Sequence, residues 1–180
     1  MRSSSPSLLS GIVLAFAALL LSGCASFRSD SGTGTAPDPG AVRLEPGPAA
    51  SAQPPVGREH ATFAFMAAEG APELVAQSLS GAIESAAAAE GLATAPTASA
   101  TYAVRAYLSA IPSGDEAIAV YVFDILDRDA TRLFRISGTV AIEGSDRDPW
   151  KGMNAAAADQ VAAAASKAIA AWLTGAISTG

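Results

Sequence analysis

Three runs of alternating apolar residues, separated by short connections, constrain the fold of this chain most strongly. They cover residues 101–111, 117–126 and 131–142. Apolar residues at every second position are typical of strands that bury one face. The connections, residues 112–116 and 127–130, are rich in turn-forming residues and too short to cross over a sheet. The sequence therefore predicts a three-stranded antiparallel meander.

One further strand and two helices are expected around this meander. Residues 61–67 alternate over a β-favouring run. The spacing predicts one helix between Pro72 and Gly91. It predicts a second from Asn154, a candidate N-cap, to Thr174, with Gly175 as the C-terminal stop. The order is strand, helix, three strands, helix. We expect an α+β fold in which a four-stranded, mainly antiparallel sheet carries two helices on one face.

The first residues predict an address outside the cytoplasm. Arg2 precedes an apolar run over residues 8–21 that is too short for a bilayer-spanning helix, so a secretory signal is the better interpretation. The sequence Leu21-Ser22-Gly23-Cys24 resembles the lipobox of bacterial lipoproteins. The resemblance implies that residues 1–23 are removed and that Cys24 is lipidated. An ordinary cleaved signal that ends near a cysteine is the alternative.

The residue after the cysteine carries a further implication of the resemblance. Lipoproteins with Asp at that position are usually kept at the inner membrane, whereas Ala25 follows Cys24 here. This favours the outer membrane, facing the periplasm, over the inner membrane. One acyl chain binds a protein to a membrane only marginally, whereas two or more anchor the protein stably. We therefore expect the acyl chains on Cys24 to hold this protein at the membrane.

Residues 24–60 are predicted to form a disordered tether that joins Cys24 to a globular domain over residues 61–180. Six Pro and five Gly fall within residues 31–58, and such a segment buries too little apolar surface to offset its ordering entropy. A loop packed onto the domain is the alternative.

The element order also resembles small α/β domains of periplasmic lipoproteins, including assembly, secretion and transport accessory factors and the amino-terminal domain of the translocation protein TolB. This resemblance covers residues 61–175 and rests on element order alone, so no functional residue is transferred. The run "YVFDILDRDATRLFRISG" is similar to a segment of uncharacterised lipoproteins from alphaproteobacteria. That similarity implies no activity.

Charge and motifs argue against several function classes. A net charge of −6 without a Lys/Arg cluster disfavours nucleic acid as a partner. Cys24 is the only cysteine, so its acylation leaves no disulfide or Cys-based metal site. His60, the only histidine, lies at the edge of the tether, where a positioned general base is not expected. The acidic run around Asp124, Asp127 and Asp129 lacks the Gly and Glu of a calcium loop. We predict no catalytic residue, no metal and no cofactor beyond the covalent lipid.

One face of the predicted sheet has the composition of a partner-binding surface. Turns centred near Ser113 and Asp129 would place Arg105 beside Tyr121, and Phe123 beside Arg135. Arginine and aromatic residues are enriched where proteins bind partners. The alternative is an ordinary solvent-facing surface with stabilising cross-strand Arg–aromatic pairs. The candidate partner-binding residues are Arg105, Tyr107, Tyr121, Phe123 and Arg135.

The sequence therefore predicts a non-enzymatic, lipid-anchored periplasmic adaptor that binds another envelope protein or its own copies. One alternative is an accessory subunit of an envelope lipid or solute transport system that binds an apolar ligand between sheet and helices. The other is a structural envelope lipoprotein.

Overall fold

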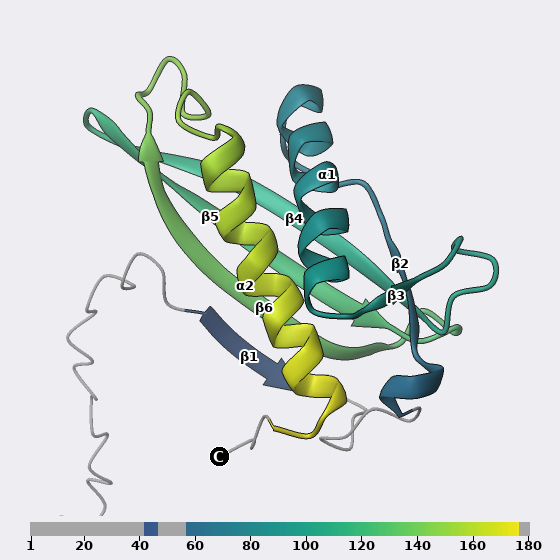
Figure 1. The fold of residues 1–180 in the computed structure, drawn as a ribbon. Helices are drawn as coiled ribbons and strands as arrows, with labels where there is room; N and C mark the ends of the chain where they lie inside the picture. Colours follow the sequence, from purple (N-terminus) through teal and green to yellow (C-terminus); the bar gives the residue numbers. More distant parts are fainter. Residues whose placement is uncertain (1–41, 47–56, 177–180) are drawn as a thin grey trace, which may run out of the picture. The chain divides into compact units, whose positions relative to one another are not determined.

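A computed structural model describes residues 42–46 and 57–176, all within the compact unit Ala36–Gly180. These residues form one mixed six-stranded sheet with two α-helices on one face (Figure 1). The signal segment, Cys24, Ala25 and most of the predicted tether lie outside the described residues. The elements in chain order are β1 (Val42–Pro46), the 3-10 helix η1 (Arg58–His60), β2 (Thr62–Phe65), α1 (Glu73–Ala89), β3 (Ala93–Thr94), β4 (Tyr102–Ser113), β5 (Glu116–Leu126), β6 (Arg132–Glu143) and α2 (Ala155–Leu173).

The predicted meander is confirmed. Strand β5 pairs antiparallel with β4 on one side and with β6 on the other. Strand β4 is longer than expected, because Pro112 and Ser113 still pair with β5 and only Gly114 and Asp115 remain for the turn. Gly114 has a φ of 69°, a value that glycine adopts without steric cost.

The sheet differs from the prediction in strand number and direction. Its order is β1-β6-β5-β4-β2-β3, so two edge strands are added to the four expected ones. Strand β2 runs parallel to β4, because α1 carries the chain back across the sheet between them. Strand β3 also pairs parallel with β2, over two residues. The sheet is therefore mixed, with antiparallel pairing confined to the β1-β6-β5-β4 side.

Strand β1 lies within the segment predicted to be a disordered tether. Its five residues, VRLEP, pair antiparallel with β6 from Val42 opposite Gly138 to Pro46 opposite Phe134. Proline and glycine surround this segment in the sequence and hide its short alternation of Val42 and Leu44. A proline is tolerated here because β1 is an edge strand. The sheet thus begins before the predicted domain boundary at residue 61.

The helices follow the predicted signals. Helix α1 ends before Gly91, whose φ is 67°, and α2 is followed by Gly175, whose φ is 66°. Asn154 is the N-cap of α2, since its side-chain oxygen accepts a hydrogen bond of 3.1 Å from the Ala157 amide. The buried face of α2 consists largely of alanine, which lets this helix pack closely against its neighbours.

Aromatic side chains fill the layer between the sheet and the C-terminal half of α2. The Trp172 ring packs edge-on against Tyr102 at 5.3 Å between centroids and stacks on Phe134 at 5.9 Å. Phe63 extends the cluster at 5.5 Å from Tyr102. These side chains are almost completely buried. They tie β2, β4 and β6 to α2, and so decide which face of the sheet the helices cover.

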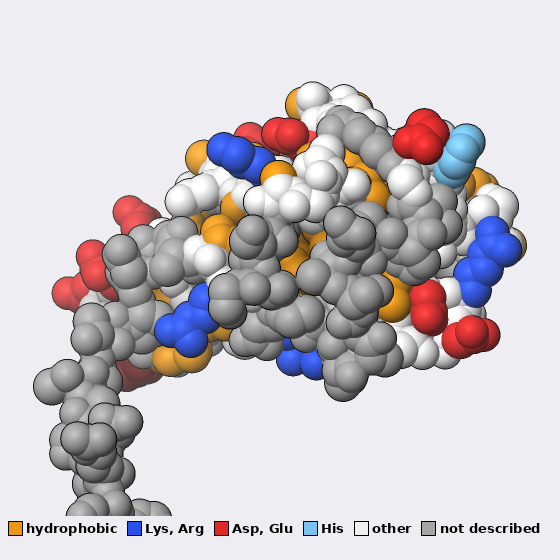
Figure 2. Space-filling view, turned by 90° about the horizontal axis from the view of Figure 1, so that it is seen from below, with side chains coloured by type: hydrophobic (Ala, Val, Ile, Leu, Met, Phe, Trp, Pro, Cys, Tyr) orange, Lys and Arg blue, Asp and Glu red, His pale blue; other side chains and the backbone are white. Residues whose placement is uncertain are grey.

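Charged side chains of both signs are spread over the surface of the described residues. Figure 2 shows acidic and basic side chains interspersed around the visible face, without a large patch of one sign. None of the helices in the described ranges combines the length and the hydrophobicity needed to cross a bilayer.

Candidate functional site: the helix-free face of the sheet

The sheet surface opposite the two helices is the candidate site, and we call it the open face (Figure 1). Strand pairing identifies its side chains, because residues opposite each other in a ladder point to the same side. Arg105 lies opposite Asp124, and Asp124 lies opposite Arg135. The open face of the three long strands includes Ala103, Arg105, Tyr107, Ile118, Val120, Val122, Asp124, Arg135, Ser137 and Thr139.

A bidentate ion pair lies on the open face near the C-terminal end of β5. The Arg135 Nε donates to Asp124 Oδ1 and Nη2 donates to Oδ2, both at 2.7 Å. Asp124 is 6% exposed although no helix covers it. Two parallel charge-assisted hydrogen bonds offset much of the cost of removing this carboxylate from water.

Arg105 is a second cation beside this pair, and its contacts are weaker. Its Nη1 donates to the Tyr107 hydroxyl at 3.5 Å, and its Nε lies 4.0 Å from Glu69 Oε1. The Tyr107 hydroxyl and the neighbouring carboxylates raise the pKa of Arg105 above its ordinary value. The Nε is buried and has no hydrogen-bond partner among the described residues. Arg105 is therefore a fixed positive charge with one unused donor.

An aliphatic line runs beside these charges along β5. We use this name for Ile118, Val120 and Val122, which are partly exposed. Val122 lies between Tyr107 and Ser137, and Val120 between Ser109 and Thr139. At its far end Ile118 pairs with Ile111, which is 54% exposed. The open face thus joins an apolar centre to polar and charged borders, the usual arrangement of a protein–protein interface.

The structure separates the five predicted partner-binding residues. Arg105, Tyr107 and Arg135 share the open face as expected. Tyr121 and Phe123 are buried in the core on the helix-covered face, at 3% and 0% exposure, so placing them with the arginines was wrong.

The register of the two hairpins explains why Tyr121 and Phe123 lie on the other face. Arg105 lies opposite Asp124, three positions from the expected Tyr121, and Arg135 lies opposite Asp124, one position from the expected Phe123. Each shift is an odd number of residues. Because side chains alternate along a strand, an odd shift exchanges the two faces of β5.

The prediction missed the residues of β5 that lie on the open face in place of Tyr121 and Phe123, namely Asp124 and the aliphatic line. Neither Asp124 nor the aliphatic line is among the predicted partner-binding residues. One signal was available in the sequence. A carboxylate inside an otherwise apolar strand, with an arginine on each neighbouring strand, favours the register that brings the three together.

The other residues considered for chemistry, Asp127 and His60, lie in a turn and on the surface. Asp127 closes the β5–β6 turn, accepting hydrogen bonds from the amides of Asp129 at 2.9 Å and Thr131 at 2.8 Å. Within residues 42–46 and 57–176, no group of His, Cys, Asp and Glu side chains is placed to hold a metal ion. His60 is 76% exposed and 3.8 Å from Glu59.

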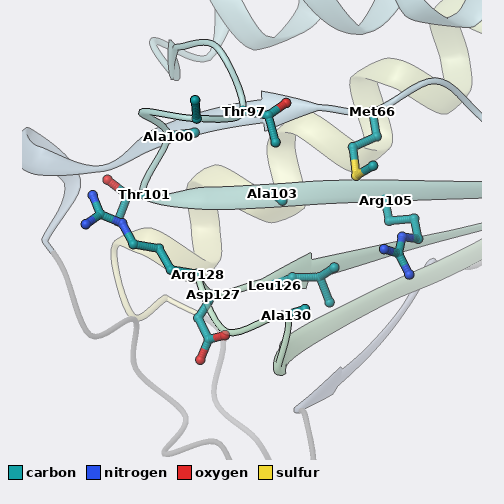
Figure 3. A pocket seen from close by; sticks show the side chains of 11 residues that line it. Met66, Thr97, Ala100, Thr101, Ala103, Arg105, Leu126, Asp127, Arg128 and Ala130 are labelled. Atoms are coloured by element: carbon teal, nitrogen blue, oxygen red, sulfur yellow. The ribbon is translucent and has the colours of Figure 1, made fainter.

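A cavity of about 450 Å³ opens at the end of the open face, where β4 begins and β5 turns into β6. Figure 3 shows Arg105 at one end of this cavity and Arg128 with Thr101 at the other, with Leu126 and Ala130 between them. The aliphatic line does not contribute to its lining.

Comparison with known proteins identifies no family. No family model matches the chain, and no curated protein matches it. Among solved structures, the chain is similar to the PelC dodecamer from Paraburkholderia phytofirmans, with 16% sequence identity and a TM-score of 0.45. That match covers 73% of this chain and 96% of PelC. A point variant of PelC in another crystal form gives the same identity and TM-score. At these values no role is transferred.

Proposed function

We propose that this protein is a non-enzymatic binding module of the bacterial cell envelope, anchored by a lipid on Cys24 and facing the periplasm at the outer membrane. The supporting observation is the aliphatic line of the open face, bordered by Arg105, Tyr107 and Arg135. The free energy falls when a partner removes such an apolar surface from water. The charged border selects the partner. The partner is another envelope protein or a second copy of this chain.

Photocrosslinking in cells tests the binding role. Val122 is the position of choice, because it lies in the aliphatic line next to Tyr107, whereas Tyr121 is buried. A photoreactive residue at Val122 is expected to trap one recurrent envelope protein or a dimer of this chain. The same probe at Ser78, on the exposed side of α1, is the matched control. Equal products from both positions, or none from Val122, would contradict the proposal.

The anchor is tested separately. Metabolic labelling with palmitate is expected to mark the protein, and Cys24→Ser is expected to remove the label and release the chain from the membrane fraction. The matched control Ser22→Ala keeps a small residue in the lipobox and should retain the label. Labelling of the Cys24→Ser chain would contradict the lipid anchor without bearing on the open face.

The runner-up function, an accessory subunit that binds an apolar ligand between sheet and helices, has less support. Trp172, Tyr102 and Phe63 occupy that layer at the C-terminal end of α2 and are almost completely buried. Native mass spectrometry separates the two proposals, since a carrier would be recovered with bound lipid and an adaptor without it.

A further inference from the structure

We propose that the cavity between β4 and the β5–β6 turn binds a small organic anion, with its acidic group at Arg105 and its apolar part on the cavity wall. This site shares Arg105 with the border of the partner surface proposed above, but the aliphatic line takes no part in it. At about 450 Å³, the cavity has the size of a small-molecule site.

The wall of the cavity combines an apolar part with polar and charged groups. Leu126 from β5 and Ala103 from β4 form its floor on the open face, and Met66 stands beside them with 37% exposure. The remaining apolar lining consists of Ala98, Ala100 and Ala130. Four of the eleven lining residues are alanine, and these short side chains leave the space open. A hydrocarbon portion of a ligand would remove this surface from water.

Arg105 supplies the charge. Its side chain is 39% exposed, and its contacts, to the Tyr107 hydroxyl at 3.5 Å and to Glu69 at 4.0 Å, are long. An anion that enters the cavity can therefore form charge-assisted hydrogen bonds with the exposed part of this guanidinium. The second open-face arginine, Arg135, already binds Asp124 through two bonds. Arg105 is thus the less engaged of these two arginines and the one that lines the cavity.

The opposite end of the cavity carries the cation Arg128, and the carboxylate next to it is engaged. Asp127 accepts two amide hydrogen bonds within its own turn. Ala130, in the same turn, has a φ of 59°, a left-handed conformation that is uncommon for alanine. The hydroxyls of Thr97 and Thr101 also border the space. An arginine at each end and two bordering hydroxyls favour a ligand that carries an acidic group and hydrogen-bond acceptors.

Calorimetric titration of the purified full-length protein with three probes tests this proposal. Hexanoate and hexyl phosphate carry an acidic group on a short chain, and hexanamide is their neutral match. We expect saturable binding of at least one anion and at least tenfold weaker binding of hexanamide. The tighter anion shows whether a carboxylate or a phosphate is preferred.

Variants locate the binding site. Arg105→Gln is expected to weaken anion binding at least tenfold, and Ala103→Leu to abolish it by filling the cavity. Arg147→Gln removes an exposed arginine outside the cavity lining and should change nothing. If Arg105→Gln unfolds, Arg128→Gln on the exposed turn replaces it, with an expected loss of at least threefold.

Three results would overturn the site: no binding of either anion, equal binding of hexanamide, or unchanged binding by both Arg105→Gln and Ala103→Leu. The partner surface has an independent readout. Ala103→Leu lies outside the aliphatic line, so crosslinking from Val122 should persist when the cavity is filled. Loss of the crosslink with intact anion binding would instead contradict the adaptor alone.

Discussion

Asp124 and Arg135 face each other across β5 and β6 and are joined by two hydrogen bonds of 2.7 Å, with the carboxylate nearly excluded from water. This pair places a charge inside a strand whose other residues, after Glu116 at its start, are apolar or aromatic. It also aligns β5 so that its aromatic residues lie beneath the helices and its aliphatic residues on the open face.

Removing the charge of Asp124 should destabilise the fold. Asp124→Asn leaves the partly buried Arg135 without its counter-charge, and we expect a loss of about 2 kcal/mol in the free energy of unfolding. Glu143→Gln is the matched control, because the Glu143–Lys151 pair is exposed, with an oxygen–nitrogen distance of 3.4 Å. It should cost less than about 0.5 kcal/mol in a urea titration. Equal losses for both variants would show that the Asp124–Arg135 pair contributes no more than a surface pair.

Gly138 should not tolerate a side chain. A Cβ built on Gly138 would overlap the Tyr121 ring, which packs over this glycine from the neighbouring strand. We expect Gly138→Ala to cost about 2 kcal/mol in thermal unfolding. In a Tyr121→Leu background the same substitution should cost much less, because the ring is gone.

A helical glycine is the control for this substitution. Gly81 lies inside α1, where a Cβ would meet nothing within 4 Å. Gly81→Ala should therefore stabilise the protein, by about 0.8 kcal/mol. Opposite signs at Gly138 and Gly81 are the expected pattern, and a neutral Gly138→Ala would contradict the close packing of Tyr121.

Stability should fall at alkaline pH through Tyr121. Burial raises the pKa of this phenol above its ordinary value of 10.0. Above pH 10 the unfolded chain therefore releases a proton that the folded chain retains, so unfolding becomes more favourable as the pH rises. Melting temperatures between pH 8 and pH 11 should fall more steeply for the natural protein than for Tyr121→Phe. Parallel curves would show that this phenol ionises equally easily in both states.

Ser166 should be replaceable with a gain in stability. It is fully buried in α2, and its hydroxyl has no hydrogen-bond partner among the described residues. Ser166→Ala is expected to raise the free energy of unfolding by about 1 kcal/mol. Ser80→Ala is the control, because the Ser80 hydroxyl donates to the Ala76 carbonyl at 2.9 Å. A larger gain at Ser80 than at Ser166 would contradict an unsatisfied buried hydroxyl.

The sequence by itself determined the elements whose signals are local. Alternation predicted the meander, helical spacing and the Asn154 cap predicted α2, and glycines marked where both helices end. These features could be predicted because each depends on residues within a few positions of one another. Three of the five candidate partner-binding residues, Arg105, Tyr107 and Arg135, were also placed on the correct face.

Only the tertiary structure decided the register of β5, the parallel pairing of β2 and the addition of β1 to the edge of β6. In β5 both faces are apolar enough to be buried, so alternation alone did not choose between Tyr121 and Val122 for the core. The choice follows from contacts distant in sequence: Tyr121 needs the space above Gly138, and Asp124 needs Arg135. A strand's pattern shows that it has two faces, but the neighbouring strands determine which one is buried.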